Sequence, residues 1–454
     1  MGKTVAFHNL GCKVNAYETD IMMKELAEKG FVIVPFDQKA DIYIVNTCSV
    51  TNIADRKSRQ MLHRAKAANP EAVIVAAGCY VNTRGEEEIK AEDADLCIIN
   101  EQKKDIAGIL EQYLKENGYD KDDTQDICDQ ERIQGTHTRC FIKVQDGCDQ
   151  FCSYCIIPYA RGRIRSKPVA KILEEVREYT RKGYREFIPT GIHISSYGKD
   201  RPGDKEDLAE LIRHMAGEDG VRRIRLSSLE PRTITEEFVR MLKGTDKLCP
   251  HFHLSLQSGS DSVLKRMNRH YTTEEYMQAV SLLRQYFTDP AITTDIITGF
   301  PGETDEEFEE TVSFVKKVGF YETHVFKYSR RKGTNADRME GQLPDRVKQE
   351  RSGVLLELNK ERKRAFEDLY TGKDRRVEVL FEDMEEIGGR VLRTGYTREY
   401  IKVYTDDRGC KEGDIAEGFI KRQGNIMVYE TQMIASHKSG FAGQVSSKPA
   451  KVRY

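Results

Sequence analysis

Short apolar runs that alternate with helical stretches constrain the fold of this 454-residue chain more than any other feature. Such alternation is typical of βαβ units, which build parallel sheets with helices packed against them. In the first part of the chain these segments are the strand-like runs Thr4–Leu10, Asp41–Asn46 and Ala72–Ala77, with helical stretches at Tyr17–Lys29 and Asp55–Ala68. We therefore expect an α/β domain of the Rossmann or flavodoxin type over residues 1–115.

The same alternation continues over residues 134–365, where six strand candidates are separated by helical stretches. The candidates are Arg139–Gln145, Arg185–Ile192, Arg222–Ser228, His251–Gln257, Ile292–Gly299 and Glu322–Ser329. Right-handed βα units curl into a barrel. Eight units close the barrel, whereas six leave it open. We expect an open (β/α)6 partial TIM barrel with its functional loops at the carboxyl ends of the strands.

A charged helix over Pro344–Leu369 leads into a third domain at residues 370–435. Five short strand-like runs are present there: Arg376–Phe381, Gly389–Arg393, Tyr400–Tyr404, Asp414–Lys421 and Asn425–Glu430. They predict a small OB-like β-barrel, a module that often binds single-stranded nucleic acid. We expect a polar linker over Glu116–Gln134 and a disordered tail over residues 436–454, which are rich in Gly, Ser and Lys.

Cys148, Cys152 and Cys155 follow the first strand candidate of the barrel with Cys-x3-Cys-x2-Cys spacing. A cubane iron–sulfur cluster normally takes four thiolates, so three thiolates leave one iron open for a substrate or cofactor. The alternative is a structural zinc site with Cys140 or Cys128 as the fourth ligand. Zinc sites favour paired Cys-x2-Cys knuckles, and the second pair is absent here.

Three further cysteines, Cys12, Cys48 and Cys79, each follow a strand-like run of the first domain. Because the carboxyl ends of parallel strands share one edge of a sheet, these thiols should converge into a second three-ligand site. Gly11 and Gly78 would let the backbone approach a cluster bound there. A lone cysteine is more often a buried core residue, which is our interpretation of Cys97, Cys128, Cys140, Cys249 and Cys410.

Polar residues at the strand ends of the barrel predict a polar ligand or a wet cleft, because a purely structural barrel would carry Val and Ile inside. On the fourth and fifth strand candidates they are His253, Ser255, Gln257 and Asp295. Thr190-Gly191 ends the second candidate, and Ser228 and Glu230 lie at the end of the third, where they look like ligand-contact loops. A structural hydrogen bond is the alternative role for any one of them, as it is for His253. Arg161, Arg163 and Arg165 follow the cysteine run and either meet RNA phosphates at the barrel mouth or form a solvated charged loop.

Composition narrows the class of protein. With 39% hydrophobic and 32% charged residues, the chain suits a globular protein with a full core. No run approaches the ~18 apolar residues of a membrane span, and the N-terminus lacks an apolar signal segment. Eleven cysteines without a signal peptide indicate metal or redox chemistry in a reducing cytoplasm rather than disulfides. We expect a cytoplasmic protein that does not contact a membrane.

Four motifs resemble the methylthiotransferase family of radical S-adenosylmethionine (SAM) enzymes, and the resemblance extends to a C-terminal TRAM module. The motifs are Asn9-Leu-Gly-Cys-Lys-Val-Asn15, Val45-Asn-Thr-Cys-Ser-Val50, Ala77-Gly-Cys79 and Gln145-Asp-Gly-Cys-Asp-Gln-Phe-Cys-Ser-Tyr-Cys-Ile-Ile-Pro-Tyr-Ala-Arg-Gly162. Two residues depart from the family's pattern, Pro189 where Leu is usual and Lys327 where Pro is usual.

This resemblance implies two [4Fe-4S] clusters and SAM as cofactors. Cys148, Cys152 and Cys155 would hold the cluster that splits SAM to a 5′-deoxyadenosyl radical. Cys12, Cys48 and Cys79 would hold an auxiliary cluster that handles the inserted sulfur. The residues implied to contact SAM are Tyr154, Thr190, Gly191, Ser228, Glu230, Gln257 and Asp295.

The segment Leu10-Gly-Cys-Lys-Val-Asn15 looks most like the branch that adds CH3–S to C2 of N6-threonylcarbamoyladenosine at tRNA position 37. The branch acting on isopentenyladenosine usually shows Tyr-Gly-Cys-Gln-Met-Asn, and the branch acting on a ribosomal protein aspartate shows Leu-Gly-Cys-Pro-Lys-Asn. One SAM would donate the methyl group and a second would generate the radical. The expected partners are the tRNA anticodon loop and an electron donor such as flavodoxin or ferredoxin, with the enzyme a monomer. A non-catalytic, zinc-bearing RNA-binding protein is the alternative from another class.

Overall fold

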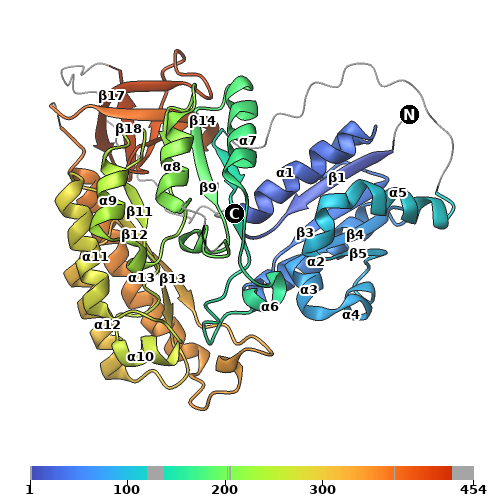
Figure 1. The fold of residues 1–454 in the computed structure, drawn as a ribbon, viewed down its shortest axis with the longest axis horizontal. Helices are drawn as coiled ribbons and strands as arrows, with labels where there is room; N and C mark the ends of the chain where they lie inside the picture. Colours follow the sequence, from blue (N-terminus) through green and yellow to red (C-terminus); the bar gives the residue numbers. More distant parts are fainter. Residues whose placement is uncertain (1–2, 120–137, 202, 204–205, 373, 432–454) are drawn as a thin grey trace.

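The computed structural model of the chain describes residues 3–119, 138–201, 203, 206–372 and 374–431. These residues form an N-terminal α/β part, a central barrel and a C-terminal β-barrel (Figure 1), so the expected α/β class is confirmed. Among the described helices, none is both long and apolar enough to span a membrane. The expected tail, and the expected linker from residue 120 onward, lie outside the described residues.

The N-terminal part is a five-stranded parallel sheet of order β2-β1-β3-β4-β5, with helices packed on both faces. Its strands are β1 (Thr4–Asn9), β2 (Val32–Val34), β3 (Ile42–Thr47), β4 (Val73–Gly78) and β5 (Leu96–Ile98). Its helices are α1 (Lys13–Glu28), α2 (Asn52–Ala68), α3 (Cys79–Arg84), α4 (Glu86–Lys90) and α5 (Ile106–Glu116), with the 3-10 helix η1 (Asn100–Asp105). The central strands β3 and β4 are fully buried, as apolar strands covered on both faces must be. The sequence pattern did not reveal β2 and β5, which are three residues long each.

The six expected barrel strands are present and run parallel in two three-stranded sheets, β10-β9-β6 and β11-β12-β13. They are β6 (Cys140–Lys143), β9 (Glu186–Thr190), β10 (Arg223–Ile224), β11 (His251–His253), β12 (Ala291–Thr298) and β13 (Glu322–Lys327). Parallel bridges between Ile224 and Leu248 and between Leu229 and Leu254 join the two sheets into one curved wall. Pro189 lies inside β9 opposite Ile142 and does not interrupt the strand.

The helices of the central part cover the outside of this wall, and short elements form its loops. The helices are α6 (Ile157–Arg161), α7 (Val169–Arg181), α8 (Leu208–Gly217), α9 (Glu236–Lys243), α10 (Asp261–Arg266), α11 (Thr273–Tyr286), α12 (Asp305–Val318) and α13 (Asp345–Asp368). The short elements are β7 (Gln145–Asp146), which pairs with β8 (Arg165–Ser166), and the 3-10 helices η2 (Ile194–Ser196), η3 (Pro231–Thr233) and η4 (Asn335–Asp337). The first strand candidate therefore divides into β6 and β7.

The barrel is open between β6 and β13, which do not pair with each other in the described part of the chain. Helix α1 packs against β6, so the N-terminal part lies along the side of the barrel (Figure 1). Helix α6 lies between the two parts in the same view. The open barrel thus meets the strand edge of the N-terminal sheet near the cysteine run.

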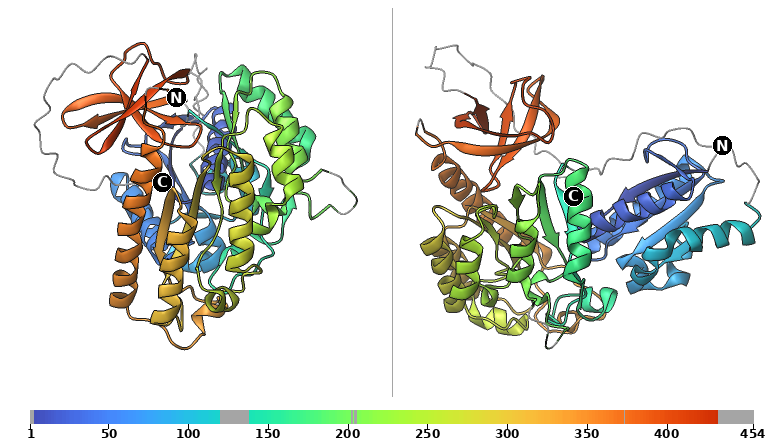
Figure 2. Two further views of the ribbon diagram at one scale, coloured as in Figure 1. Left: turned by 90° about the vertical axis from the view of Figure 1, so that its left-hand side faces the viewer. Right: turned by 45° about the horizontal axis from the view of Figure 1, so that its top comes forward.

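The C-terminal part is a closed five-stranded barrel of order β14-β15-β16-β18-β17, as the sequence predicted. Its strands are β14 (Val377–Ile387), β15 (Arg390–Thr397), β16 (Lys402–Thr405), β17 (Ile415–Gln423) and β18 (Ile426–Glu430). Helix α13 runs along the central barrel to this module (Figure 2). Ion pairs of Arg139 with Glu382 and of Arg223 with Glu378, at 2.7 and 2.6 Å, fix it to the amino ends of the barrel strands.

Candidate active site

The loop that carries Cys148, Cys152 and Cys155 is held in one conformation at the carboxyl end of the barrel. Within it, the amide of Cys155 donates a hydrogen bond to the carbonyl of Cys152 at 2.9 Å. Gly147 has a φ of +70°, and a Cβ added to it would lie 1.8 Å from the carbonyl oxygen of Arg163. Only glycine fits there. All three thiols remain partly exposed, so a ligand can reach them.

Burial affects the pKa of two of these three thiols. Burial raises the pKa of Cys148 to about 11 and that of Cys155 to about 12. They are therefore protonated at neutral pH unless a metal displaces the proton, because the thiolate is the ligand. The guanidinium of Arg269 donates a hydrogen bond to Sγ of Cys152 at 3.1 Å.

Sulfur spacing favours a cluster over a single ion. Among the described residues, only His253, Asp295 and His324 form a group of three or more His, Cys, Asp or Glu side chains whose ligand atoms all lie within 4.8 Å of one another. Neither cysteine triad meets this criterion. A tetrahedral zinc site has Zn–S bonds of about 2.3 Å and hence sulfur atoms about 3.8 Å apart. Both cysteine triads are wider than this, as thiolates that bind different irons of one cluster should be.

Cys140 does not lie where it could complete a zinc site. It is buried in the barrel core with Ile142 and Val144. Burial raises the pKa of its thiol, and the charges of Asp20 on α1 and Glu175 on α7 raise it further. These neighbours lie on the outer, helical side of β6, away from the cysteine loop. Cys128, the other candidate for a fourth ligand, lies outside the described residues.

Glu230 is connected to the cysteine loop through Arg269. Its carboxylate pairs with Arg269, the residue that donates to Cys152, and lies 3.5 Å from Nε2 of His193. Burial alone would raise the pKa of Glu230, but the neighbouring His193 and the charge of Arg269 outweigh it and lower the pKa. An anionic carboxylate beside the cysteine loop is suited to an ammonium group or to ribose hydroxyls.

The other expected SAM contacts also lie around this end of the barrel, and they remain predictions. Thr190 is buried at the end of β9, whereas Ser228 is exposed after β10. Gln257 has a φ of +69°, rare for a residue other than glycine, and its amide donates to the carbonyl of Asp295 at 2.8 Å. Such backbone outliers cluster at ligand sites. Tyr154 packs beside Met267 and Phe300, and Gly191 directly follows β9.

Cys12, Cys48 and Cys79 follow the neighbouring strands β1, β3 and β4, and the structure brings them together. A Cβ added to Gly11 would lie 2.8 Å from Sγ of Cys48, so the Gly11 backbone passes directly over that thiol. Burial raises the pKa of Cys48 to about 12, and the thiols of Cys12 and Cys79 act on it in the same direction. Three thiols therefore face a common space at this edge, and their binding of a cluster remains a prediction.

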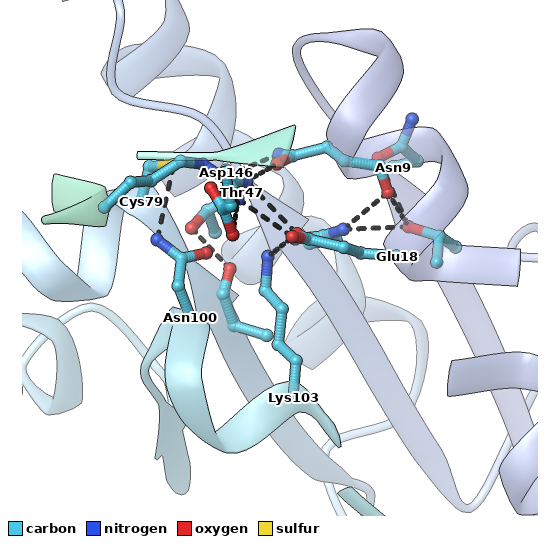
Figure 3. A network of polar contacts seen from close by, with 12 residues as sticks. Asn9, Glu18, Thr47, Cys79, Asn100, Lys103 and Asp146 are labelled. Carbon is cyan, nitrogen blue, oxygen red and sulfur yellow. Dashed lines mark hydrogen bonds and ion pairs between the residues drawn. The ribbon is translucent and has the colours of Figure 1, made fainter. Parts of the chain in front are cut away.

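The two cysteine sites are neighbours across the boundary between the N-terminal part and the barrel. Helix α3 begins at Cys79 and packs on α6, which begins two residues after Cys155. The side-chain amide of Asn100 donates to Sγ of Cys79 at 3.6 Å and to the carbonyl of Ala160 on α6 at 2.9 Å (Figure 3). A pocket of about 290 Å³ at this junction is lined by Thr83, Arg84, Glu88, Ile156, Arg331 and Lys332.

The prediction that Arg161 contacts RNA is wrong, because its side chain is completely buried. Its guanidinium donates to the carboxylates of Glu18 at 2.8 Å and Asp146 at 3.2 Å, and to the side-chain oxygen of Asn15 at 2.7 Å. No donor is left facing the solvent. Arg161 instead joins the barrel to the N-terminal part.

Glu18 is the centre of this buried network, part of which Figure 3 shows. Besides Arg161, it pairs with Lys103 at 2.7 Å and with Lys143 at 2.6 Å. Burial alone would raise the pKa of Glu18, but the charges of these three residues hold it well below its usual range. Arg163 and Arg165, by contrast, have exposed side chains, and their contact with RNA remains a prediction.

Lys13, the residue after Cys12, is close enough to the barrel for charged barrel residues to act on its pKa. Burial lowers the pKa of its ammonium to about 8, with further contributions from the charges of Arg139 and Arg225, while Asp295 acts in the opposite direction. Asp295 lies on β12, whereas Arg139 directly precedes β6 and Arg225 directly follows β10. The Lys13 side chain is nevertheless exposed to solvent.

Sequence reasoning missed Arg269, Asn100 and Glu18. Arg269 and Asn100 each donate to a cysteine from a distant part of the chain, and no local motif marks any of the three residues. Glu18 lies six residues after Cys12 inside a helical stretch, where a carboxylate is usually a solvated surface residue. Only the packing of α1 against the barrel reveals that it is buried.

Two family models match the chain. The model described as Radical SAM superfamily matches residues 142–315, and the model described as Uncharacterized protein family UPF0004 matches residues 4–100. Each range contains one of the two cysteine triads. Among solved structures, the radical S-adenosylmethionine methyltransferase TsrM from Kitasatospora setae, with cobalamin and a [4Fe-4S] cluster bound, superposes with a TM-score of 0.55. At 15% identity over 74% of this chain and 77% of that one, this likeness shows the fold alone.

Curated relatives match most of the chain. It is 38% identical to the threonylcarbamoyladenosine tRNA methylthiotransferase MtaB of Aquifex aeolicus, over 84% of this chain and 93% of that one. It is 39% identical to the protein of the same name from Bacillus subtilis, over 88% and 90%. It is 35% identical to the tRNA-2-methylthio-N(6)-dimethylallyladenosine synthase of Clostridium tetani, over 84% and 86%.

Proposed function

The chain belongs to the radical SAM tRNA methylthiotransferase family, and from this premise we propose that it adds a methylthio group to C2 of N6-threonylcarbamoyladenosine at position 37 of tRNA. The observation that carries the proposal is the meeting of two three-thiol sites where α3 packs on α6. Relatives at 38 and 39% identity named for threonylcarbamoyladenosine support the substrate. The enzyme class excludes the non-catalytic zinc protein considered from the sequence.

We assign a [4Fe-4S] cluster to Cys148, Cys152 and Cys155 and an auxiliary cluster to Cys12, Cys48 and Cys79. The residues fit both groups, because each triad offers three soft sulfur ligands with spacing too wide for one zinc ion. When bound, the barrel cluster supplies the electron that cleaves SAM, which radical chemistry at an aromatic C–H bond requires. Electrons would come from a donor such as flavodoxin or ferredoxin.

The protein's own residues hold and orient the reactants. Glu230 and the backbone at Thr190-Gly191 would bind SAM beside the first triad. The buried ion pairs of Glu18 keep the second triad in fixed relation to the first. A fixed relation matters because the carbon that loses hydrogen must lie next to the sulfur it receives.

An exposed platform beside the first triad supports RNA binding at the barrel mouth. Phe151 and Tyr159 are exposed aromatic residues whose ring centroids lie 6.1 Å apart, and the Arg163 guanidinium lies 5.3 Å from the Phe151 ring centroid. Exposed rings stack on unpaired bases, and nearby arginines meet phosphates. An anticodon-loop nucleotide is already largely unpaired, so little stacking is lost when it enters the barrel. The C-terminal β-barrel would grip the tRNA farther from the chemistry.

The test gives reconstituted enzyme tRNA that carries either threonylcarbamoyladenosine or isopentenyladenosine at position 37. The proposal expects methylthiolation of the threonylcarbamoyl substrate, detected by mass spectrometry of the nucleosides, and little of the other. Preferential reaction with isopentenyladenosine would contradict the substrate. Activity only on a ribosomal protein aspartate would contradict the RNA function altogether.

A further inference from the structure

Two histidines and a carboxylate meet on the inner face of the second barrel sheet. His253 lies on β11, Asp295 on β12 and His324 on β13, which are neighbouring strands. In the strand register Asp295 is directly opposite His324, and His253 is opposite Thr293, which shares a face of β12 with Asp295. Phe252, on the other face of β11, packs in the core with residues of the outer helices. The three polar side chains therefore point away from the helices, into the barrel.

The ligand atoms of these three side chains are close enough to share one ion. Each of the three offers a nitrogen or oxygen atom, and these atoms all lie within 4.8 Å of one another. Oδ2 of Asp295 lies 3.3 Å from Nε2 of His253. A tetrahedral zinc ion with bonds of about 2.0–2.1 Å holds its ligand atoms about 3.4 Å apart. The pair of His253 and Asp295 already has this separation, and a side-chain rotation of His324 can close the rest.

The contacts around the triad orient its ligand atoms. Nδ1 of His253 is hydrogen-bonded to Oγ1 of Thr293 at 3.0 Å, so the opposite nitrogen, Nε2, faces Asp295. A second hydrogen bond of this kind usually orients a metal-bound histidine. The ring of His324 stacks on that of His253 with centroids 5.7 Å apart, and it makes no hydrogen bond or ion pair with any residue that the structure describes. A simple ion pair of His253 with Asp295 does not account for a second imidazole beside it.

The ligand set selects a class of metal. Two imidazole nitrogens and one carboxylate oxygen suit divalent transition metals such as zinc, whereas magnesium and calcium prefer oxygen ligands alone. Three protein ligands leave at least one coordination position for water or for an oxygen atom of a bound molecule. The side chains of His253 and Asp295 are 13% and 30% exposed. An ion can therefore reach the triad from the solvent.

We propose that His253, Asp295 and His324 bind one divalent transition-metal ion of the zinc class, at a site separate from both cysteine triads. The ion would join three neighbouring strands, of which β13 borders the opening of the barrel. This role of Asp295 differs from the SAM contact predicted from the sequence. Asp295 lies three residues before the end of β12, inside the strand rather than in the loop that follows it. The inference goes beyond the proposed function and does not depend on it.

The experiment counts zinc and iron in the cluster-loaded protein after anaerobic equilibrium dialysis against a series of free Zn²⁺ concentrations. Bound clusters occupy the cysteines, so an unchanged iron content shows that zinc has not displaced them. Asp295→Asn removes the carboxylate charge and keeps the size of the side chain, and His324→Gln removes the second imidazole. His63→Gln is the control, because His63 is an exposed histidine that is also paired with a carboxylate, that of Asp93 at 2.5 Å.

The wild type should bind about one zinc per chain with its iron unchanged. Asp295→Asn and His324→Gln should each weaken zinc binding by at least about 10-fold, because loss of a ligand costs no less than loss of a residue that orients one. His63→Gln should change the affinity by less than about 2-fold. Absence of bound zinc in the wild type, zinc bound only as iron is lost, or equal affinity in the wild type and in both triad variants would each overturn the inference.

Discussion

The Nη1 atom of Arg161 lies 2.8 Å from the Oε1 atom of Glu18. Arg161 is the last residue of α6, which follows the barrel's cysteine loop, and Glu18 belongs to the helix that begins after Cys12. One buried ion pair therefore connects the segments that carry the two cysteine sites. The pair explains how two parts of the chain with separate cores keep their thiols in a constant arrangement.

Replacing Glu18 should destabilise the folded protein strongly. Glu18→Gln leaves the cations of Arg161, Lys103 and Lys143 without their common carboxylate, and an uncompensated buried charge costs about 3–5 kcal/mol. The measurement is urea unfolding at pH 7. Lys24→Gln on the same helix is the control, because it removes only the exposed pair with Glu178 and should cost less than about 1 kcal/mol. Similar losses for the two variants would argue against a role for this network in stability.

Adding a methyl group at Gly147 should disable the barrel site. Gly147→Ala brings Cβ within 1.8 Å of the Arg163 carbonyl, so the cysteine loop must move and should lose its iron. Gly183 also has a positive φ, but nothing lies within 4 Å of its Cβ position, so Gly183→Ala introduces strain without a clash. The measurement is iron content after reconstitution. Full iron in the Gly147→Ala protein would show that the loop tolerates the displacement.

Iron analysis also tests the presence of two sites. Because each cubane cluster contains four irons, reconstituted protein should hold about eight per chain. The variant with Cys148, Cys152 and Cys155 all changed to Ala should keep about half of them. The corresponding variant of the other triad should still cleave SAM to 5′-deoxyadenosine but should insert no methylthio group. A folded barrel-triad variant with no iron at all would contradict the assignment of a second cluster.

Local sequence patterns predicted the fold well because strands and helices of this chain are amphipathic or fully apolar over five or more residues. Strands β3 and β4 are such segments, and so is the expected helix that became α2. The strands β2 and β5 have three residues each and are too short to show a period in hydrophobicity. Arg161 was misassigned because its neighbours Arg163 and Arg165 are exposed, and sequence spacing does not reveal which of three arginines meets a carboxylate from another domain.

Stability in acid should depend on Glu186. Burial alone would raise the pKa of this carboxyl, but Arg225 and Arg223 outweigh burial and lower it to about 2, from 4.5 in the unfolded chain. Because the folded pKa is the lower one, the contribution is complete above about pH 4.5 and is lost as the pH falls toward 2. The urea midpoint of the wild type should therefore fall more steeply from pH 5 to pH 3 than that of Glu186→Gln. Parallel pH profiles for the two proteins would contradict this pKa.

The most direct test of the proposed function is mass spectrometry of tRNA nucleosides from cells that lack the gene. We expect the 2-methylthio derivative of N6-threonylcarbamoyladenosine to be absent and the unmethylthiolated nucleoside to accumulate. The wild-type gene should restore the product, and the Cys148→Ala gene should not. Unchanged 2-methylthio-N6-threonylcarbamoyladenosine, with loss of the isopentenyl derivative or of no nucleoside at all, would contradict the account.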